Sequence, residues 1–199
     1  MIKFALLLAA VTATPFSLKG WQLGDDIETL RASPLPNTQY SPAHFECSDT
    51  SALPSLKPDD MLAAAGVVRC HAVETIGGSV VFSDLSVLGD TPVYADFLFL
   101  KRKLFRIEIY ADRSHTNDML TALSQKYGAP TVRRAGTFQV RSGASFPQEV
   151  VTWRHQGQTL TLTSPDAALE RLSLIYSDDA ASSAVAGSRA QGLRGKNDL

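Results

Sequence analysis

The sequence of 199 residues has only two cysteines and four histidines, and it lacks the short motifs of the commoner catalytic sites. It contains no P-loop, GxGxxG, HExxH, CxxC or GxSxG pattern. An enzyme would therefore have to bring an acid, a histidine and a serine together from distant positions. We predict no catalytic residue and no cofactor. The sequence favours a non-enzymatic protein over a small hydrolase whose site forms only in the fold.

Long apolar runs are also absent after residue 13, and a helix that crosses a bilayer needs about 20 apolar residues. Residues 1–13 have the features of a short secretory signal: Lys3 supplies positive charge, residues 4–11 are apolar, and residues 11–13 form a small-x-small cleavage site. A buried N-terminal element is the alternative. No cysteine comes directly after the apolar run, so a lipoprotein anchor is not indicated. We predict a periplasmic or secreted protein with no transmembrane span.

The two cysteines, Cys47 and Cys70, are predicted to form a disulfide, because an exported chain meets an oxidising compartment. By loop entropy, such a bond would stabilise the fold by about 3 kcal/mol. A metal site with His44 and His71 is the alternative, since two cysteines and two histidines suit zinc. On a strand, however, the adjacent Cys70 and His71 would point to opposite faces, so we predict no metal site.

The net charge of −1 hides an uneven distribution. Residues 14–100 contain eleven acidic and four basic side chains, whereas residues 101–154 contain ten basic and four acidic ones. A basic surface could bind an acidic protein, an anionic lipid headgroup or a nucleic acid. The simpler interpretation is that the two regions face each other in the fold, or that their charges are solvated. No motif of interleaved basic and aromatic residues supports a nucleic-acid partner.

The stretch from residue 93 to residue 130 is predicted to organise the fold. Apolar and polar side chains alternate in residues 93–100 and again in residues 105–110, which predicts two strands that each bury one face. Residues 101–103 lie between them and fit a hairpin turn. Because this turn contains no Gly or Asn, a two-residue turn with positive φ angles is not favoured.

A helix is predicted after this hairpin. Ser114 or Thr116 is expected to cap its N-terminus. Gly128 suits the position that follows the helix, and Pro130 prevents the helix from continuing. The apolar residues that share one side of it at helical spacing are Met119, Leu120, Leu123 and Tyr127.

The remaining chain is predicted to add short helices, further strands and a tail. Helices are expected at residues 25–32, with Asp25 as the N-cap, and at residues 59–65. The proline-rich residues 33–58 are expected to form an irregular surface loop. Residues 178–199 hold few large apolar side chains and are expected to be a disordered tail. Further strands are predicted at residues 67–75, 80–87, 131–141, 149–155, 159–163 and 172–176.

These elements predict the fold class and the domain boundaries. Strands joined by short turns should pair antiparallel. We therefore expect residues 14–177 to form an α+β domain, as a single unit or as two small lobes. In it, a mainly antiparallel sheet would carry two or three short helices packed on one face.

Two features are candidate binding sites. Lys101, Arg102 and Lys103 form a basic cluster next to Tyr94 and Tyr110 on the neighbouring predicted strands, and the alternative is a solubilising hairpin tip.

Trp21 is the second candidate, because tryptophan is enriched in interface hot spots and this one lies near the expected mature N-terminus. Trp153 alternates with Val151 and is expected in the core.

The acidic pairs at residues 25–26 and 59–60 could bind a cation, but both stand at predicted helix starts, where carboxylates act as caps.

Several segments, taken in their order along the chain, carry a resemblance. They are Gly20-Trp21-Gln22-Leu23-Gly24, Cys47, Cys70, Phe97 with Lys103-Leu104-Phe105-Arg106-Ile107, Leu123 with Lys126-Tyr127-Gly128-Ala129-Pro130, and Trp153. This order resembles that of small exported bacterial α+β proteins of unknown function. It is similar to the order of elements in the SmpA/OmlA (BamE) outer-membrane assembly proteins and in the β-lactamase inhibitory protein. The resemblance implies a binding or accessory role and supplies no catalytic residues, and the sequence lacks the lipobox cysteine of the assembly proteins.

Together these observations predict an exported, non-enzymatic protein that binds another protein of the cell envelope. Besides the hydrolase, the alternative is a protein that binds a small anionic ligand in its basic region.

Overall fold

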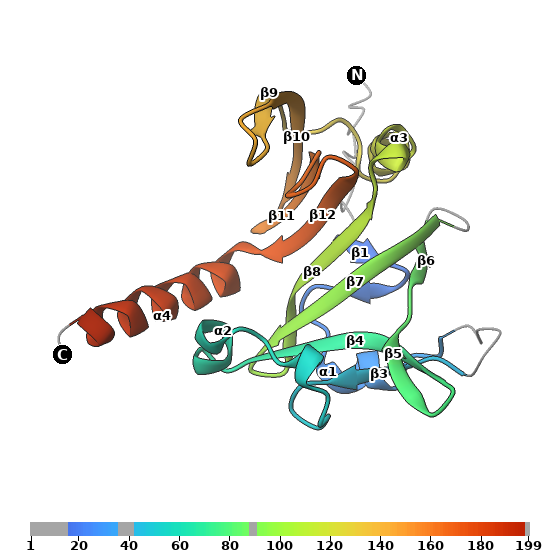
Figure 1. Ribbon diagram of the computed structural model, residues 1–199, viewed down its shortest axis with the longest axis vertical. Helices are drawn as coiled ribbons and strands as arrows, with labels where there is room; N and C mark the ends of the chain where they lie inside the picture. Colours follow the sequence, from blue (N-terminus) through green and yellow to red (C-terminus); the bar gives the residue numbers. More distant parts are fainter. Residues whose placement is uncertain (1–15, 36–41, 88–90, 198–199) are drawn as a thin grey trace, which may run out of the picture.

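The computed structural model describes residues 16–35, 42–87 and 91–197 (Figure 1). The predicted secretory signal at residues 1–13 lies outside the described residues. None of the described helices combines the length and the apolar content that crossing a bilayer requires.

The described chain is an α+β protein in which every pair of neighbouring strands is antiparallel, as the sequence predicts. Its strands are β1 (Ser17–Leu18), β2 (Trp21–Gln22), β3 (His44–Cys47), β4 (Val67–Ile76), β5 (Ser79–Phe82), β6 (Leu85–Val87), β7 (Thr91–Leu100), β8 (Lys103–Asp112), β9 (Val132–Gln139), β10 (Ser145–His155), β11 (Gln158–Ser164) and β12 (Arg171–Asp178). Its helices are α1 (Ile27–Arg31), α2 (Asp60–Ala64), α3 (Thr116–Tyr127) and α4 (Asp179–Asn197), with short 3-10 turns at η1 (Pro54–Leu56) and η2 (Arg113–His115).

The strands other than β1 and β2 form one twisted sheet, in the order β3-β4-β7-β8-β12-β11-β10-β9 (Figure 1). β5 pairs with β4, and β6 pairs with β7. β8 and β12 are far apart in the sequence but adjacent in the sheet, with Ile109 opposite Leu174. This pairing joins the two halves of the sheet, β3-β4-β7-β8 and β12-β11-β10-β9, and both halves contribute to one large hydrophobic core.

One face of the sheet, which we call the core face, carries most of the buried apolar side chains. Phe97, Ile107 and Trp153 lie on it and are almost inaccessible to solvent. α1 and α3 cover this face, α3 through Met119 and Leu123. The alternation of apolar and polar residues in the sequence therefore identified the buried side of the central strands correctly, except at Phe105.

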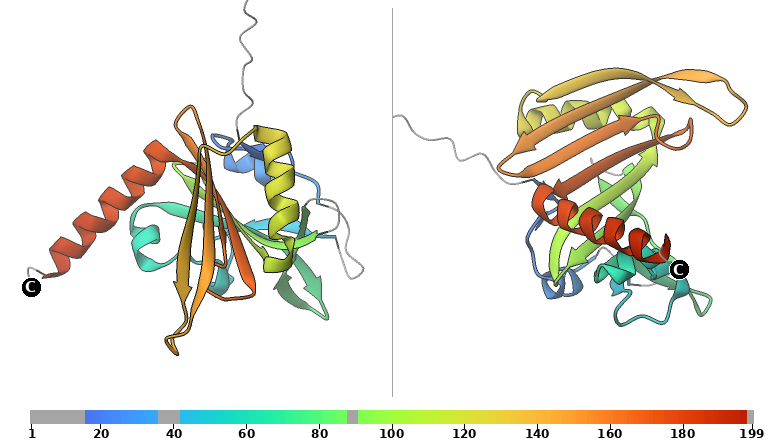
Figure 2. Two further views of the ribbon diagram at one scale, coloured as in Figure 1. Left: turned by 90° about the horizontal axis from the view of Figure 1, so that it is seen from above. Right: turned by 90° about the vertical axis from the view of Figure 1, so that its left-hand side faces the viewer.

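The opposite face is covered in part by α2 and α4, and Figure 2 shows α3 and α4 on opposite sides of the strands. A second, smaller apolar cluster joins Leu98 and Phe105 of the sheet to Val185 of α4. Phe105 reaches this face because the pairing of β7 with β8 shifts register beside Leu98, as at a β-bulge. The prediction that the helices pack on one face only is therefore wrong, because these side chains need cover on the other face.

Helix α4 occupies the residues expected to be a disordered tail. The side chain of Asp178 accepts a hydrogen bond from the backbone N–H of Ala181 (2.8 Å), as an N-cap does. Val185 is buried against the sheet, and alanine, the best helix former, recurs along the helix. The helix therefore has an N-cap and a buried apolar contact with the sheet, which its low hydrophobicity did not predict.

The other two short helices form where the sequence predicts them. Asp59 caps α2 by accepting from the N–H groups of Met61 and Leu62. Asp26, rather than the expected Asp25, caps α1 by accepting from the N–H of Glu28. Both acidic pairs thus supply helix caps.

The start of α3 differs from the expectation. Neither Ser114 nor Thr116 caps this helix; Asp112 instead accepts from the N–H of Ser114 at the start of η2. The end agrees, since Gly128 follows the helix with a φ of 80°.

The predicted loop at residues 33–58 is partly regular, because β3 lies within it and pairs with β4. The hairpin tip also differs from the prediction. Leu100 is opposite Lys103, so the turn consists of two residues only, Lys101 (φ 49°) and Arg102 (φ 68°). A two-residue turn with positive φ angles matches the twist of the strands, and here that geometry prevails although neither residue is Gly or Asn.

Candidate functional site

Beyond the cluster under α4, the face opposite the core carries charged and aromatic side chains from four adjacent strands, β4, β7, β8 and β12. They lie on one side because they occupy alternate positions of paired strands, for example Tyr94 opposite Tyr110. Most are partly exposed. We call this set the Arg–Tyr face; it comprises Arg69, Tyr94, Asp96, Arg106, Glu108, Tyr110 and Arg171.

Asp96 is the centre of the first half of this face. Arg69 donates two hydrogen bonds to its carboxylate, from Nε (2.7 Å) and from one terminal nitrogen (2.8 Å). The same terminal nitrogen donates to the hydroxyl of Tyr94 (2.7 Å). Burial lowers the pKa of Arg69, but the hydrogen bonds and charge of Asp96 outweigh it and raise that pKa overall. The planar, two-pronged contact holds the guanidinium in one orientation.

His71 lies beneath this pair and is fully buried. Its Nδ1 is 3.2 Å from Oδ1 of Asp96, and its ring packs at a tilt against Phe82 and Tyr94, with centroid distances of 4.3 Å and 4.2 Å. Within the described part of the chain, its Nε2 has no hydrogen-bond partner.

A histidine and an acid thus meet only in the fold, as the hydrolase alternative requires. That alternative also needs a nucleophile bonded to the second ring nitrogen and a route for substrate. Among the described residues no hydroxyl group is hydrogen-bonded to His71 Nε2, and the ring is enclosed by two aromatic side chains. The polar contact that the described residues show for the His71 ring is the one with Asp96, which fixes the orientation of that carboxylate.

Tyr110 is the centre of the second half. Its hydroxyl donates to the carboxylate of Glu108 (3.0 Å), which also pairs with Nε of Arg106 (2.6 Å). The guanidinium of Arg171 lies 4.7 Å from the centre of the Tyr110 ring, within the range of a cation–π contact. Burial, followed by the charge of Glu108, raises the pKa of Tyr110 far above its usual range.

A cleft of about 320 Å³ adjoins this face where α2 and α4 approach β8. Arg106 and Glu108 line it together with Leu62 and Val185. The Arg–Tyr face thus continues from an open sheet surface into a partly apolar recess.

The hairpin tip predicted as a binding site is exposed but already paired. Arg102 donates to Asp26 (3.0 Å) and Glu28 (3.1 Å), and Lys103 lies 3.8 Å from Asp26. Within the described residues, Lys101 has no ion pair. The acidic N-terminal region therefore faces the basic hairpin at this point, which agrees with the simpler interpretation of the charge distribution.

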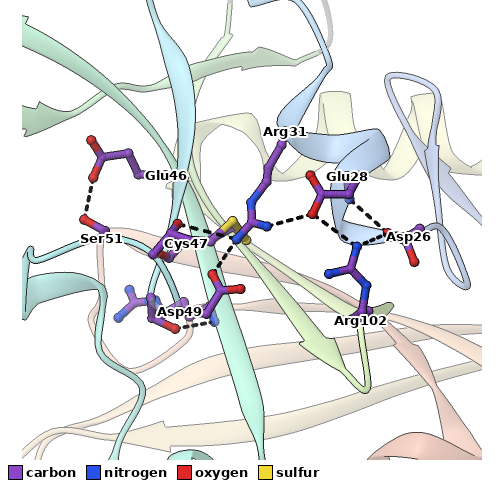
Figure 3. The surroundings of a disulfide bond; sticks show 12 residues. Asp26, Glu28, Arg31, Glu46, Cys47, Asp49, Ser51 and Arg102 are labelled. Atoms are coloured by element: carbon purple, nitrogen blue, oxygen red, sulfur yellow. Dashed lines mark hydrogen bonds and ion pairs between the residues drawn. A yellow bond between two sulfur atoms is a disulfide. The ribbon is translucent and has the colours of Figure 1, made fainter.

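The network of ion pairs around Arg102 extends towards the disulfide (Figure 3). Glu28 also accepts from Arg31, which bonds to Asp49 in the turn after β3. Cys47 and Cys70 lie directly opposite each other on β3 and β4 and form the predicted disulfide. Both cysteines are used in that bond, and the described residues contain no group of three or more His, Cys, Asp or Glu side chains that could hold a metal ion.

Trp21 is not available as a surface anchor. Only 7% of it is exposed, its Nε1 donates to the hydroxyl of Ser33 (2.8 Å), and its ring contacts Phe45 and Phe97. The core prediction for Trp153 is confirmed, and its Nε1 donates to the carbonyl of Gly128 (2.9 Å). Both tryptophans therefore hold the core together.

The sequence interpretation missed the Arg–Tyr face, although part of the signal is visible. Arg106, Glu108 and Tyr110 were correctly assigned to one side of a strand, opposite the apolar side. What could not be inferred is that β4 and β12 would be placed beside β7 and β8 and bring Arg69 and Arg171 to the same surface.

A family model described as "Uncharacterised protein" matches residues 72–196, which include most of the sheet and α4. No curated protein and no solved structure matches the chain. The similarity in element order to the BamE proteins and the β-lactamase inhibitory protein therefore remains a prediction.

Proposed function

Since the chain belongs to the family described as "Uncharacterised protein", we propose its function from the structure: it is an exported, non-enzymatic protein that binds another protein of the cell envelope through the Arg–Tyr face. The disulfide supports export, because disulfides persist mainly in oxidising compartments.

The composition of the face carries the proposal. Its partly exposed side chains are three arginines, two tyrosines and Glu108, and it contains no lysine. Arginine and tyrosine are enriched at protein–protein interfaces and in their hot spots, whereas lysine is depleted there. The hairpin tip, with two lysines among its three basic residues, has the composition of an ordinary solvated surface.

The face is also rigid before any partner binds. The Arg69 side chain, 22% exposed, is fixed by Asp96 and Tyr94, and Arg171 is held against the Tyr110 ring. Ordering a long side chain at an interface costs about 0.5–1.5 kcal/mol, and side chains that are already ordered avoid part of this cost.

The charges of the face indicate the class of partner. Arg69 is neutralised by Asp96, Arg106 by Glu108, and Arg171 lies 3.8 Å from Asp166. An anionic polymer needs uncompensated cations, which this surface does not offer. A protein surface of mixed polarity with a few acceptors for arginine suits it better.

A binding experiment with matched arginine variants tests the proposal. Partners in envelope extract are identified by cross-linking to the full chain, and their affinity is then measured by calorimetry with purified protein. We expect the double variant Arg106→Ala and Arg171→Ala to weaken binding about tenfold or more, as loss of interface arginines does.

The control is the double variant Arg134→Ala and Arg154→Ala, which removes two exposed arginines of the same sheet outside the face. It should bind like the unmodified chain, and both doubles should keep its melting temperature within a few degrees. Equal affinity of the two doubles would refute this face as the binding site. A loss confined to a third variant, with Lys101, Arg102 and Lys103 replaced by Glu, would place the site at the hairpin tip.

A further inference from the structure

A cavity of about 180 Å³ lies on the core side of the sheet, away from the Arg–Tyr face. It opens between α3, the sheet and the two-residue turn that joins β1 to β2. Its walls are apolar and come from segments far apart in the sequence: Leu18, Val87, Ile109, Met119, Leu123 and Leu174.

The size of the cavity limits what it can hold. An apolar cavity of about 150 Å³ takes up benzene, so about 180 Å³ has room for an apolar group of roughly six or seven carbon atoms. The cavity is too small for the full acyl chain of a membrane lipid. The cavity opens at the surface, so it is accessible to a small ligand.

Basic side chains supply the charge in the described part of the lining. Lys19 and Lys126 line the cavity and are exposed, and no acidic residue of the described chain lines it. Lys126 donates to the backbone oxygen (2.8 Å) and the hydroxyl (3.1 Å) of Ser17, which leaves the third N–H of its ammonium group for a ligand. Within the described residues, Lys19 has no ion pair.

Local structure explains how the two cations are held here. Lys19 has a φ of 49° and is the first residue of the tight turn between β1 and β2. Lys126 is in the last turn of α3, and its bonds to Ser17 tie the helix to the β1–β2 hairpin. An anionic group bound here would meet positive charge from two separate elements.

We propose that this cavity binds a small carboxylate with a straight apolar chain of about six or seven carbon atoms beyond the carboxyl group, the chain filling the cavity and the carboxylate meeting Lys19 and Lys126. The ligand is a free acid in solution, because the cavity cannot take a whole lipid chain. This site is independent of the protein-binding role proposed above.

Calorimetric titration of the full chain with octanoate tests the proposal. Two compounds of the same chain length serve as comparisons: octanol, which is uncharged, and octylamine, which carries a positive charge. We expect octanoate to bind, octanol to bind several-fold more weakly and octylamine not to bind. Equal binding of all three, or no binding of octanoate, would refute an anion-selective site.

Three variants localise the site. Lys19→Gln with Lys126→Gln should weaken octanoate binding about five- to tenfold, in line with the modest strength of exposed ion pairs. Lys101→Gln is the matched control, because Lys101 holds the same position in another two-residue turn with positive φ and should leave the affinity unchanged. Ala122→Leu adds bulk to the cavity lining and should abolish binding while the melting temperature is kept.

The source of the ligand is tested with vesicles of phosphatidylglycerol in a flotation assay. We expect no flotation of the chain, since a free acid is the proposed ligand. Flotation that octanoate does not reduce would overturn the proposal in favour of a lipid surface, and so would unchanged octanoate affinity in Ala122→Leu.

Discussion

The two faces of the large sheet are built from the same strands but differ in chemistry and in cover. On the core face, Phe97 and Ile107 are fully buried beneath α1 and α3. On the opposite face, Asp96 and Glu108 lie one position along the same strands and bind arginines that are partly exposed. Because successive side chains of a strand point to opposite sides, two strands supply both a stabilising core and a polar surface.

The difference between the faces indicates a division of labour. Burial of apolar area stabilises the fold, and the core face carries most of the buried apolar side chains. The polar face contributes little apolar area, yet its side chains are fixed by specific hydrogen bonds. We therefore expect substitutions on the core face to lower stability and substitutions at the exposed edge of the other face to alter binding.

The largest expected effect comes from the centre of the core face. Replacement of Phe97 by Ala should lower the free energy of unfolding by about 3–5 kcal/mol, because it leaves a cavity in a closely packed region. Urea denaturation measures this change. Thr161→Ala, a partly exposed position on the opposite side of the sheet, should change it by less than about 0.5 kcal/mol. Similar losses in both variants would contradict the division of labour.

The disulfide belongs to the core face, since Cys70 is opposite Phe97 in the sheet. Replacing Cys47 and Cys70 by Ala should lower the free energy of unfolding by about 3 kcal/mol, because the unfolded chain regains the freedom of the closed loop. Urea denaturation of the double variant tests this. Thiol titration of unfolded protein from its native compartment should detect no free thiol, and two free thiols would contradict both the bond and the export proposal.

On the opposite face, the most costly change should be at Asp96. Asp96→Asn removes the carboxylate that binds Arg69 and leaves that half-buried guanidinium without its charge partner. Breaking such a pair should cost about 2–3 kcal/mol, somewhat less than for a fully buried pair. Glu149→Gln, which breaks the exposed pair with Arg133, should cost less than about 0.5 kcal/mol and serves as the control in the same denaturation series.

A smaller effect is expected where α4 covers the polar face. Val185→Ala should cost about 1–2 kcal/mol and should loosen α4, since Val185 is its buried apolar contact with Leu98 and Phe105. Hydrogen exchange would report faster exchange along α4 with little change in α3. Ala184→Ser, on the exposed side of the helix, should leave exchange nearly unchanged; equal effects would show that this contact does not hold the helix.

The smallest effect at neutral pH concerns Tyr110, but it grows in alkaline solution. Burial and Glu108 raise the pKa of Tyr110 in the folded chain above the value of about 10 in the unfolded chain. The folded state therefore holds the phenol proton more tightly, and stability should fall as the pH rises above about 10. Tyr110→Phe should make that fall shallower in thermal melts between pH 9 and pH 11, and an unchanged slope would contradict the raised pKa.

Much of the fold could be predicted from local patterns. Residues close in sequence determine the hairpin of β7 and β8 and the end of α3 before Gly128. The disulfide was predictable because two cysteines allow one pairing, Cys47 with Cys70. The turn at Lys101 and Arg102 was predicted wrongly because the twist of two long strands outweighed the preference of glycine and asparagine for positive φ.

The candidate sites were much less predictable. Trp21 was expected at the surface but is buried against Phe45 and Phe97. These two residues lie on strands far from Trp21 in the sequence, so local sequence does not show that they cover it. Lys101 and Arg102 stood out as consecutive charges, yet Arg102 is neutralised by Asp26 and Glu28, more than 70 residues away. A run of charge in a sequence shows which residues are basic but not which carboxylates face them.

The sequence by itself determined which side chains of each strand are apolar, where α2 and α3 end, and which cysteines could pair, because these features depend on neighbours a few residues apart. Only the tertiary structure decided that Arg69, Asp96 and Tyr110 share one surface, that α4 folds against it, and that Lys19 and Lys126 line one cavity. The reason is that strand order brings together residues from distant parts of the chain, and no local preference fixes that order.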